Sequence, residues 1–357
     1  MAYLRPPIPF LMEYSKFFQY CKVLLLTGYS TSNFKDISFS EEGICSYCQE
    51  NRTVAKQVHI TDEKRKQYCA EIDTLIDTYK GKGLYDCVVG FSGGKDSTYL
   101  LWKLKNEYNL NVLAVVIDHG YFPDVTIENI NELPRKMGID VIKYNINTGF
   151  MDRFFKKKFE TYETKAIFDD VCADCSNILE GNVIKVAQAF KIPLVFIGLS
   201  PEQVNRYFFE MPEDHLDSNW RFDESEYFQE RDYLYSWQGK ELDELKVILP
   251  FHVWEYDESE IVELLEKENL VNKEKSNPMM TRCKILDTMC YLDKKRIGYD
   301  GFIAPFSDLI RMGKASREKY YEMFYGNAYQ LNMKHVDEVV ERLNLDMDML
   351  INKKEKE

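Results

Sequence analysis

The stretch Cys87-Val88-Val89-Gly90-Phe91-Ser92-Gly93-Gly94-Lys95-Asp96-Ser97-Thr98 joins a short apolar segment to a helical pattern. Gly93 and Gly94 allow a tight turn in which backbone N–H groups face an anion. The helix that follows directs the positive end of its dipole at the same point, and Lys95 adds a positive charge. Ser92 and Ser97 supply hydroxyl donors. The stretch therefore predicts a strand, a phosphate-binding turn and a helix, in that order.

This loop does not have the spacing of the Walker P-loop, which requires Gly-x4-Gly-Lys followed by Ser or Thr. Val89 stands at the first glycine position, and Asp96 follows the lysine. The loop instead resembles the Ser-Gly-Gly-x-Asp-Ser signature of the PP-loop ATP pyrophosphatases, which bind ATP on a Rossmann-like sheet and cleave it between the α and β phosphates. The alternative is an ordinary strand-to-helix turn that carries a surface lysine and has no binding role. The resemblance implies that ATP is bound by Ser92, Gly93, Gly94, Lys95, Asp96 and Ser97, with Lys95 and Asp96 also acting in catalysis.

Length and composition indicate a globular protein. The chain has 357 residues, of which 45% are hydrophobic, enough for one large α/β domain with smaller attachments. No apolar stretch approaches the roughly 20 residues of a membrane span. The run Val23–Leu26 is short and follows Glu13 and Lys16, so it is not typical of a secretory signal. We expect a cytoplasmic protein without a membrane partner.

The formal net charge is −13, and acidic residues are spread along the chain without a compensating basic stripe. Proteins that bind a long polyanion usually present a basic face, because phosphate neutralisation supplies most of the affinity. The charge therefore disfavours tRNA as the substrate and favours a sugar or another small molecule.

Alternating strand and helix patterns predict the fold. After the first strand, apolar β-branched segments recur at 112–117, 140–144, 192–198 and 247–249, with a helix at 127–137 after the first of these. This order is typical of a doubly wound parallel sheet, so we predict an α/β, Rossmann-like fold. The predicted parts are an N-terminal cysteine-containing accessory region at 1–80, a nucleotide-binding domain at 81–250 and a helical C-terminal region at 251–357. The accessory region is predicted to be irregular to about residue 60 and to continue with a charged helix at 61–79.

Two further strand ends are candidate binding positions, because ligands of such sheets bind beyond the carboxyl ends of the strands. Asp118 and His119 follow the second strand, and Gly198 follows the fourth. The PP-loop resemblance implies that Asp118 contacts the ribose or base of ATP. Alternatively, Asp118 and His119 form a solvated turn, and Gly198 serves only close backbone packing.

The segment 201–239 is dense in acidic and aromatic residues and has no sustained period of 2 or 3.6. A loop of this length inside a compact domain is usually functional or mobile. It is predicted to be either a lid over the substrate or a helical insertion that packs its aromatic side chains inward. The C-terminal region continues with a helix start at Asp257 and a last helical section from about Ser316.

Nine cysteines in a cytosolic chain indicate metal, redox or catalytic groups before disulfides. Cys172 and Cys175 form a C-x2-C pair, predicted to precede a helix at 176–189, whose N-terminus would favour thiolates. Cys283 lies further along the chain, and Cys290 is an alternative to it. The order resembles the three-cysteine [4Fe-4S] site of the tRNA thiolation branch of PP-loop enzymes, which implies Cys172, Cys175 and Cys283 as cluster ligands. Buried structural cysteines or a zinc pair are the alternatives.

A second C-x2-C pair, Cys45 and Cys48, is half of a structural Zn2+ site. Cys21, with Cys69 as a further candidate, would complete it. The spacing of these two cysteines from the pair permits a zinc knuckle without requiring one.

A second resemblance covers both ends of the chain. The segments 36–48, 85–99 and 311–318 are similar to the bacterial N-acetyl sugar amidotransferases of lipopolysaccharide and flagellar glycan biosynthesis. That family tends to open with its own C-x2-C pair, whereas here Cys21 is followed by Leu24. Its second strand also usually ends differently from Asp118-His119-Gly120-Tyr121. The resemblance implies an N-acetyl sugar as acceptor and a separate glutaminase that supplies ammonia.

Both resemblances imply the same first step, in which ATP adenylates a substrate oxygen and pyrophosphate departs. Ammonia or a sulfur nucleophile then displaces AMP. Mg2+ is expected with the phosphates, and Asp96 is the nearest side chain to orient it, with helix capping as the alternative role. The charge and the extent of the resemblance favour sugar amidation; sulfur transfer to tRNA or a small molecule is the alternative, and a non-enzymatic ATP sensor is the third interpretation.

Overall fold

The computed structural model describes residues 18–20, 27–29, 40–41, 62–146, 148–162, 167–201, 245–271, 283–296, 300–303, 306, 310, 316–325 and 331–353. The chain divides into two compact units. The first contains Met1–Gln57 and Cys290–Leu331, and the second contains Val58–Met289 and Asn332–Glu357. The boundaries predicted near residues 80 and 250 stay predictions.

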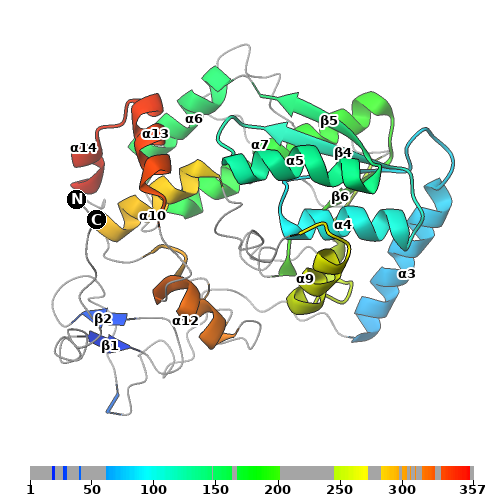
Figure 1. Cartoon of the computed structure of the whole chain (residues 1–357), viewed down its shortest axis with the longest axis horizontal. Coiled ribbons are helices and arrows are strands. Elements are labelled where there is room, and N and C mark those ends of the chain that lie inside the picture. Colours follow the sequence, from blue (N-terminus) through cyan, green and yellow to red (C-terminus); the bar gives the residue numbers. More distant parts are fainter. Residues whose placement is uncertain are drawn as a thin grey trace. The chain divides into compact units, whose positions relative to one another are not determined.

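A parallel sheet of five strands is the centre of the second unit, with the order β5-β4-β3-β6-β7 (Figure 1). Its strands are β3 (Cys87–Gly90), β4 (Val112–Asp118), β5 (Asp140–Asn145), β6 (Leu194–Ile197) and β7 (Lys246–Ile248). From the central β3 the chain first adds β4 and β5 on one side and then β6 and β7 on the other. This confirms the predicted doubly wound α/β sheet.

The apolar runs of the strands reflect burial on both faces of the sheet. Successive side chains of a strand point to opposite faces. On β4, Val112, Ala114 and Val116 join the main core cluster. Leu113 and Val115, between them, are also buried but lie outside that cluster. A sheet covered by helices on both faces needs such continuous hydrophobic strands.

Helices cover the sheet in two groups. The helices between the strands are α4 (Lys95–Asn106), α5 (Asp124–Met137), α6 (Thr148–Thr161) and α7 (Ile167–Phe190), and α3 (Asp62–Tyr79) precedes the sheet. Helix α4 packs against β3, β4 and α5, whereas α7 packs against β3, β4, β6 and α6 (Figure 1). A Cβ added at Gly90 would lie 3.5 Å from a methyl group of Val183, so α7 passes close to the end of β3.

The C-terminal part is helical, as predicted. It contains the short turn η2 (Pro250–His252) and the helices α9 (Glu258–Lys267), α10 (Lys284–Arg296), α12 (Arg317–Tyr325), α13 (Met333–Leu343) and α14 (Met347–Ile351). Asp257 caps α9 by accepting hydrogen bonds from the N–H groups of Ser259 and Glu260. The helix start predicted at Asp257 is therefore confirmed.

The first unit contains two short antiparallel strands, β1 (Phe18–Tyr20) and β2 (Thr27–Tyr29), in which Phe18 pairs with Tyr29. The prediction of irregular structure before residue 60 is wrong for these residues, because strands this short carry no visible alternation of polar and apolar side chains. Cys21, Cys45, Cys48 and almost all of the segment 201–239 lie outside the described residues. Among the helices that the structure does describe, none combines the length and apolarity needed to cross a membrane.

Candidate functional site: a phosphate loop and a cysteine group

The phosphate loop lies between the carboxyl end of β3 and the first turn of α4. Gly93 has φ +76°, a left-handed conformation that favours glycine. A Cβ at this position would also lie 3.2 Å from the carbonyl oxygen of Thr126. The side chain of Asn129 donates to the carbonyl of Gly93 at 2.9 Å. The turn is therefore held tightly against α5, and its shape requires glycine.

Hydroxyl groups hold the two sides of the loop together. The hydroxyl oxygens of Ser92 and Ser97 are 3.2 Å apart, and the backbone N–H of Ser92 donates to Ser97 Oγ at 3.3 Å. Ser97 and Thr98 both donate their hydroxyls to the carbonyl of Gly94, at 3.1 and 2.8 Å. Ser92 is exposed while Ser97 is buried. The predicted phosphate-binding residues are thus gathered into one compact turn at the start of a helix.

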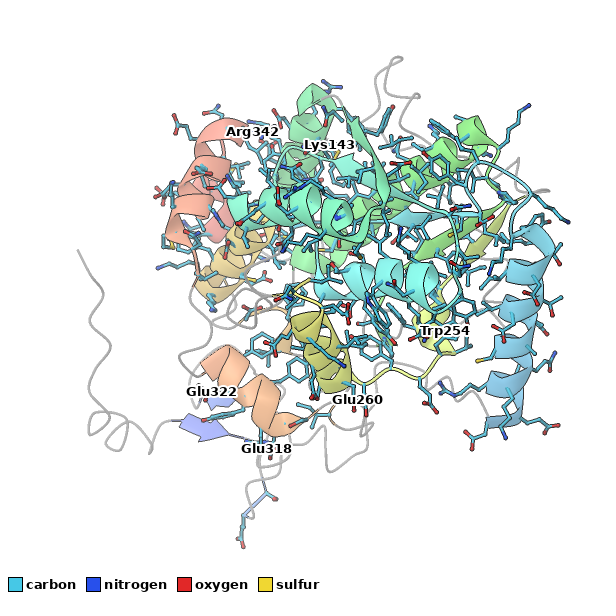
Figure 2. The ribbon with its side chains drawn as sticks, turned by 45° about the vertical axis from the view of Figure 1, so that its right-hand side comes forward. Lys143, Trp254, Glu260, Glu318, Glu322 and Arg342 are labelled. Atoms are coloured by element: carbon cyan, nitrogen blue, oxygen red, sulfur yellow. The ribbon has the colours of Figure 1, made fainter. Side chains whose placement is uncertain are left out.

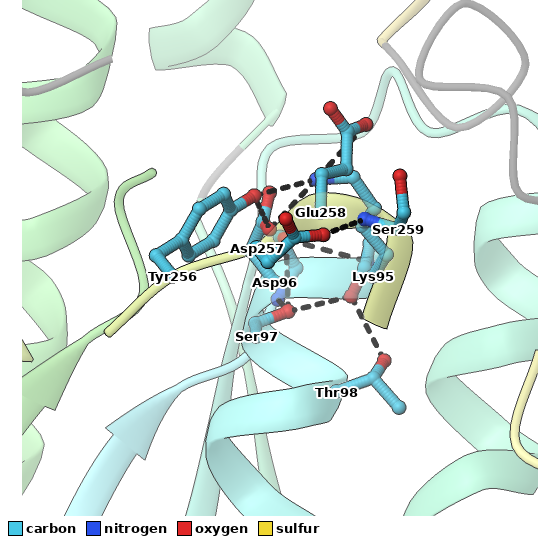
Figure 3. A network of polar contacts seen from close by, with 10 residues as sticks. Lys95, Asp96, Ser97, Thr98, Tyr256, Asp257, Glu258 and Ser259 are labelled. Atoms are coloured by element: carbon cyan, nitrogen blue, oxygen red, sulfur yellow. Dashed lines mark hydrogen bonds and ion pairs between the residues drawn. The ribbon is translucent and has the colours of Figure 1, made fainter. Parts of the chain in front are cut away.

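Lys95 and Asp96 form a polar network with Tyr256 from the segment before α9 (Figure 3). Lys95 Nζ donates to Asp96 Oδ1 at 2.7 Å and to the Tyr256 hydroxyl at 2.9 Å. The Tyr256 hydroxyl in turn donates to Asp96 Oδ1 at 2.6 Å. Glu258 Oε1 lies 3.6 Å from Lys95 Nζ. A cation, a carboxylate and a phenol therefore meet beside the phosphate loop.

Sequence reasoning missed Tyr256 and Glu258. They lie far along the chain from the loop, and no spacing or motif links them to Lys95. The capping residue Asp257 marks the start of α9 in the sequence, but it does not indicate which element α9 packs against. The N-cap of α4 is Gly94, and Asp96 lies in the first turn of that helix. The Asp96 side chain bonds to Lys95 and Tyr256, and its roles in helix capping and toward Mg2+ stay predictions.

Gly198 follows β6 and lies against the first turn of α4. A Cβ at Gly198 would be 3.2 Å from the Cα and 3.3 Å from the N of Ser97. Glycine therefore allows the end of β6 to approach the phosphate loop closely. This gives Gly198 the packing role that the sequence left open, and a contact with ATP stays a prediction.

Asp118 ends β4 and is partly buried. Its carboxylate accepts from the Gly120 N–H at 2.8 Å and pairs with Lys143 of β5 at 3.0 Å (Lys143 is labelled in Figure 2). Burial alone would raise the pKa of Asp118, but the Gly120 hydrogen bond and Lys143 lower it below its usual range. Asp118 is therefore ionised and held in place, as an acceptor for a ribose or a base would need to be.

His119 is a core residue and not part of a solvated turn. Burial lowers its pKa to about 4, so the ring is neutral at physiological pH. Its Nδ1 accepts from the N–H of Tyr121 at 3.2 Å, and its ring packs against Phe122 at 4.3 Å between centroids. The alternative of a solvated strand-end turn is wrong for this residue, because the neighbouring aromatic side chains enclose it.

Cys172 and Cys175 lie inside α7 and not before a helix. The predicted start at residue 176 is wrong, since α7 begins at Ile167. Val171 and Ile167, both buried, extend the apolar face of the helix about one and two turns before Cys175. The cysteines consequently lack the free N–H groups of a helix N-terminus that were expected to favour thiolates.

Cys175 interacts electrostatically with two other cysteines. Its side chain is partly exposed, but protein surrounds it closely enough that burial raises the pKa of the thiol well above its usual value. Negative charge on Cys283 and Cys172 would act in the same direction, followed by Asp174 and Glu180. Cys172, Cys175 and Cys283 are thus brought into one group, which we call the cysteine group.

The backbone beside Cys283 is hydrogen-bonded to the loop after β4. The N–H of Lys284 donates to the carbonyl of Tyr121 at 2.9 Å. Since α7 leads into β6 and runs back across the sheet, its first half lies toward the carboxyl ends of the strands. The cysteine group and the phosphate loop are therefore both on the ligand-binding edge of the sheet.

Cys290, the alternative third cysteine, belongs to the first unit. It is buried, and its thiol lies 3.6 Å from the carboxylate of Asp300. The position of Cys283 beside Cys175 favours Cys283 as the third member. Within the described part of the chain, no three His, Cys, Asp or Glu side chains are arranged to hold a metal ion. Zn2+ and [4Fe-4S] sites therefore stay proposals.

Glu180 is a buried acid one turn and a half beyond Cys175 on α7. Burial raises its pKa to about 8, although the hydroxyl of Ser176, which donates to Oε1 at 2.9 Å, acts in the opposite direction. Among described residues, Oε2 has no hydrogen-bond partner. The carboxyl is therefore mostly protonated at neutral pH, and it adds a weak acid to the surroundings of the cysteine group.

The sequence from 86 to 231 matches the family model described as a phosphoadenosine phosphosulfate reductase domain. This segment holds β3, the phosphate loop, Asp118 and the cysteine pair of α7. The match, together with the loop signature, relates the nucleotide-binding part of the chain to the PP-loop ATP pyrophosphatase superfamily and supports an enzyme that uses ATP. It does not separate an amidotransferase from a sulfurtransferase.

Relatives among curated proteins cover part of the chain. An uncharacterized protein of Methanocaldococcus jannaschii is 29% identical over 136 residues, which are 38% of this chain and 45% of the relative. The glutamine-hydrolyzing GMP synthase of Pyrobaculum aerophilum is 38% identical over 68 residues, 19% of this chain and 14% of the synthase. The chain thus matches less than half the length of these relatives.

Solved structures with some similarity include the NMN synthetase of Francisella tularensis, with a TM-score of 0.38, 14% identity and coverage of 80% of this chain and 94% of the synthetase. The U34-tRNA thiolase NcsA of Methanococcus maripaludis, solved with its [4Fe-4S] cluster, has a TM-score of 0.37 and 16% identity, covering 79% of this chain and 91% of the thiolase. Similarity at this level carries no argument about the function of this chain.

Proposed function

We propose that this protein is an ATP pyrophosphatase that adenylates an oxygen of its acceptor and then replaces that oxygen with sulfur. The adenylation step is supported by the phosphate loop and by the family match over its surroundings. The observation that carries the choice of sulfur is the cysteine group, in which Cys283 joins the Cys172 and Cys175 pair of α7.

The first step requires neutralisation of the phosphates. The N–H groups of the loop and the first turn of α4 receive the anion, and Lys95 supplies the positive charge nearest to it. Asp96 would help to hold Mg2+, which would neutralise part of the phosphate charge when bound with ATP. Asp118 would accept a hydroxyl of the ribose or a base N–H. The acceptor oxygen attacks the α phosphorus, an O–P bond forms, and pyrophosphate leaves.

The second step is a displacement at the acceptor carbon. A sulfide-level sulfur adds to the carbon that carries the adenylated oxygen, a C–S bond forms, and the C–O bond breaks with AMP as the leaving group. The proton of the sulfur nucleophile goes to solvent. The sulfur is supplied from outside as sulfide, so the substitution requires no oxidant or reductant.

The thiols of the cysteine group are the type of ligand that iron–sulfur clusters take. Cys172, Cys175 and Cys283 would be the ligands of a [4Fe-4S] cluster, and a bound cluster would supply iron to which sulfide could bind. The protein itself contributes the enclosure of Cys175 and the attachment of the Cys283 segment to Tyr121. The acceptor proposed on grounds of charge is a small molecule, and tRNA is the less favoured acceptor.

A second candidate function is the amidation of an N-acetyl sugar in surface polysaccharide biosynthesis, with ammonia from a separate glutaminase. It is favoured by the similarity of segments 36–48, 85–99 and 311–318 to that group, and by the match to a glutamine-hydrolyzing synthase. The phosphate loop would act identically in both reactions. The cysteine group would then be structural or hold Zn2+, as Cys45, Cys48 and Cys21 would in the N-terminal region.

One experiment separates the two functions. The protein is purified without oxygen, analysed for iron and zinc, and incubated with ATP and Mg2+ in two parallel assays. One assay contains radiolabelled sulfide with tRNA or a pool of small metabolites, and the other contains 15N-ammonia with N-acetyl sugar nucleotides. Pyrophosphate and the incorporated label are measured in both.

Sulfur incorporation that is lost in Cys283→Ser and kept in Cys290→Ser is the expected result. Incorporation of 15N without sulfur would establish the amidation instead. If the wild-type protein releases no pyrophosphate in any assay, the proposed function is wrong.

A further inference from the structure

Tyr256 contacts both charged residues of the phosphate loop with one hydroxyl group. The hydroxyl accepts from Lys95 Nζ at 2.9 Å and donates its single proton to Asp96 Oδ1 at 2.6 Å. Figure 3 shows the phenol oxygen directed at both residues. Hydrogen bonds to ionised groups are shorter and stronger than those between neutral groups. The hydroxyl therefore limits the positions available to both side chains.

The ring of Tyr256 is fixed independently of that hydroxyl. It packs against Phe251 at 5.4 Å between centroids. It also borders two apolar clusters, the main core and the small cluster of Ile261, Leu265 and Leu270 on and after α9. The phenol oxygen is thus held by packing from the C-terminal part of the chain. The positions of Lys95 and Asp96 therefore depend on the segment before α9, which is not part of the phosphate loop.

We propose that Tyr256 is a positioning residue for the nucleotide site, acting through Lys95 and Asp96. When ATP binds, Lys95 exchanges its contact with Asp96 for a phosphate oxygen. The Tyr256 hydroxyl keeps its hydrogen bond to Asp96, so the carboxylate stays beside α9 and does not follow the lysine. Without that hydrogen bond, Asp96 competes with the phosphate for the ammonium group. The inference rests on the proposed use of ATP and holds for either incoming nucleophile.

Tyr256→Phe tests this role, because it removes the hydroxyl and keeps the ring that packs on Phe251. A matched control is Tyr99→Phe, since Tyr99 is partly buried, packs on the same Phe251 ring at 5.7 Å and borders the same two clusters. ATP with Mg2+ is titrated into each protein in a calorimeter, and pyrophosphate release and melting temperature are measured on the same samples. We expect the dissociation constant for ATP to rise about tenfold in Tyr256→Phe, in line with the loss of a charged hydrogen bond, and less than about twofold in Tyr99→Phe.

A double-mutant cycle distinguishes positioning from a general structural effect. If Tyr256 acts through Asp96, the loss caused by Tyr256→Phe largely disappears in an Asp96→Asn background, because the two changes affect one interaction. A purely structural effect would add to that of Asp96→Asn and would lower the melting temperature. Equal ATP affinity in the Tyr256 and Tyr99 variants, or additivity in the cycle, overturns the proposal. If wild-type protein binds no ATP, the proposed function fails first, and the inference fails with it.

Discussion

The phosphate loop is made by one continuous run of residues, from Ser92 to Thr98, whereas the cysteine group combines Cys172 and Cys175 of α7 with Cys283 from just before α10. The loop is polar, and its groups bond to one another over a few residues. The cysteine group is partly buried, and burial raises the pKa of the Cys175 thiol and of the neighbouring Glu180 carboxyl. A local motif can therefore identify the first region, but only the fold assembles the second.

The largest expected effect concerns the loop. Lys95→Ala removes the positive charge beside the phosphates, so we expect pyrophosphate release to fall roughly 100-fold or more. Lys105→Ala is the matched control, because Lys105 lies in the last turn of the same helix and its ammonium group donates to the carbonyl of Gly138. Initial rates at saturating ATP measure the effect. Equal rates for the two variants would remove Lys95 from the ATP site.

Gly93→Ala tests how strictly the backbone of the loop is defined. Both Gly93 and Gly81 have φ above +70°, but a Cβ would meet Thr126 and Ile130 only at Gly93, while at Gly81 nothing lies within 4 Å. Gly81→Ala should therefore lose about 1 kcal/mol of unfolding free energy from the backbone alone. We expect Gly93→Ala to lose more than that and to bind ATP more weakly. Urea denaturation and ATP titration measure both quantities, and equal stability losses would show that crowding at the loop is unimportant.

Glu180→Gln tests the protonation state of the buried acid near the cysteine group. The pKa of Glu180 is about 8 in the folded protein, against an ordinary value near 4.5. The unfolded chain therefore releases this proton at a lower pH than the folded protein does. The contribution of this proton to the free energy of unfolding is fully present below about pH 4.5. It is lost as the pH rises through 8, at up to about 1.4 kcal/mol per pH unit.

Glutamine keeps an oxygen for the Ser176 hydroxyl and removes the titration. We expect Glu180→Gln to be stabilised relative to wild type by about 1 kcal/mol or more at pH 8, with a smaller difference at pH 5. Glu268→Gln is the control, because Glu268 is exposed. The difference in unfolding free energy between this variant and wild type should not increase from pH 5 to pH 8. Denaturant unfolding at several pH values gives the comparison. A pH-independent difference for Glu180→Gln would contradict the protonated state.

The smallest effect is expected at Arg342, which ties α13 to the loop after β4 (Figure 2). Arg342 donates to the Gly120 carbonyl at 2.6 Å, pairs with Asp152 at 2.9 Å and lies 4.1 Å from the centre of the Tyr121 ring. The pair is about one third exposed, so Arg342→Met should cost only about 1 kcal/mol of stability. Exposed Arg135→Met should cost less. Thermal unfolding of the two variants measures the difference. Equal melting temperatures would show that the contacts of Arg342 do not contribute to stability.

Much of the sheet was predictable because its signals are local. The strand at 112–118 is an apolar run long enough to read from the sequence, and the strand at 140–145 is marked by Val141, Ile142 and Tyr144. The glycine-rich turn marks the first crossover. The start of α7 was predicted nine residues too late, at 176 instead of 167. The cysteines and polar residues in its first turns obscured the apolar spacing of Ile167 and Val171. Predicted positions such as Cys21, Cys45 and Cys48 lie outside the described residues and stay predictions.

The sequence by itself determined the parallel α/β sheet and the phosphate loop, because apolar strand segments and turn chemistry are each set by a few neighbouring residues. The tertiary structure decided which distant side chains complete each region. Tyr256 reaches Lys95 only because α9 packs on α4. Cys283, and not Cys290, lies near Cys175 of α7, and the adjacent Lys284 N–H is bonded to Tyr121 in the loop after β4. Contacts of this kind depend on how elements pack, and packing leaves no fixed spacing in the sequence.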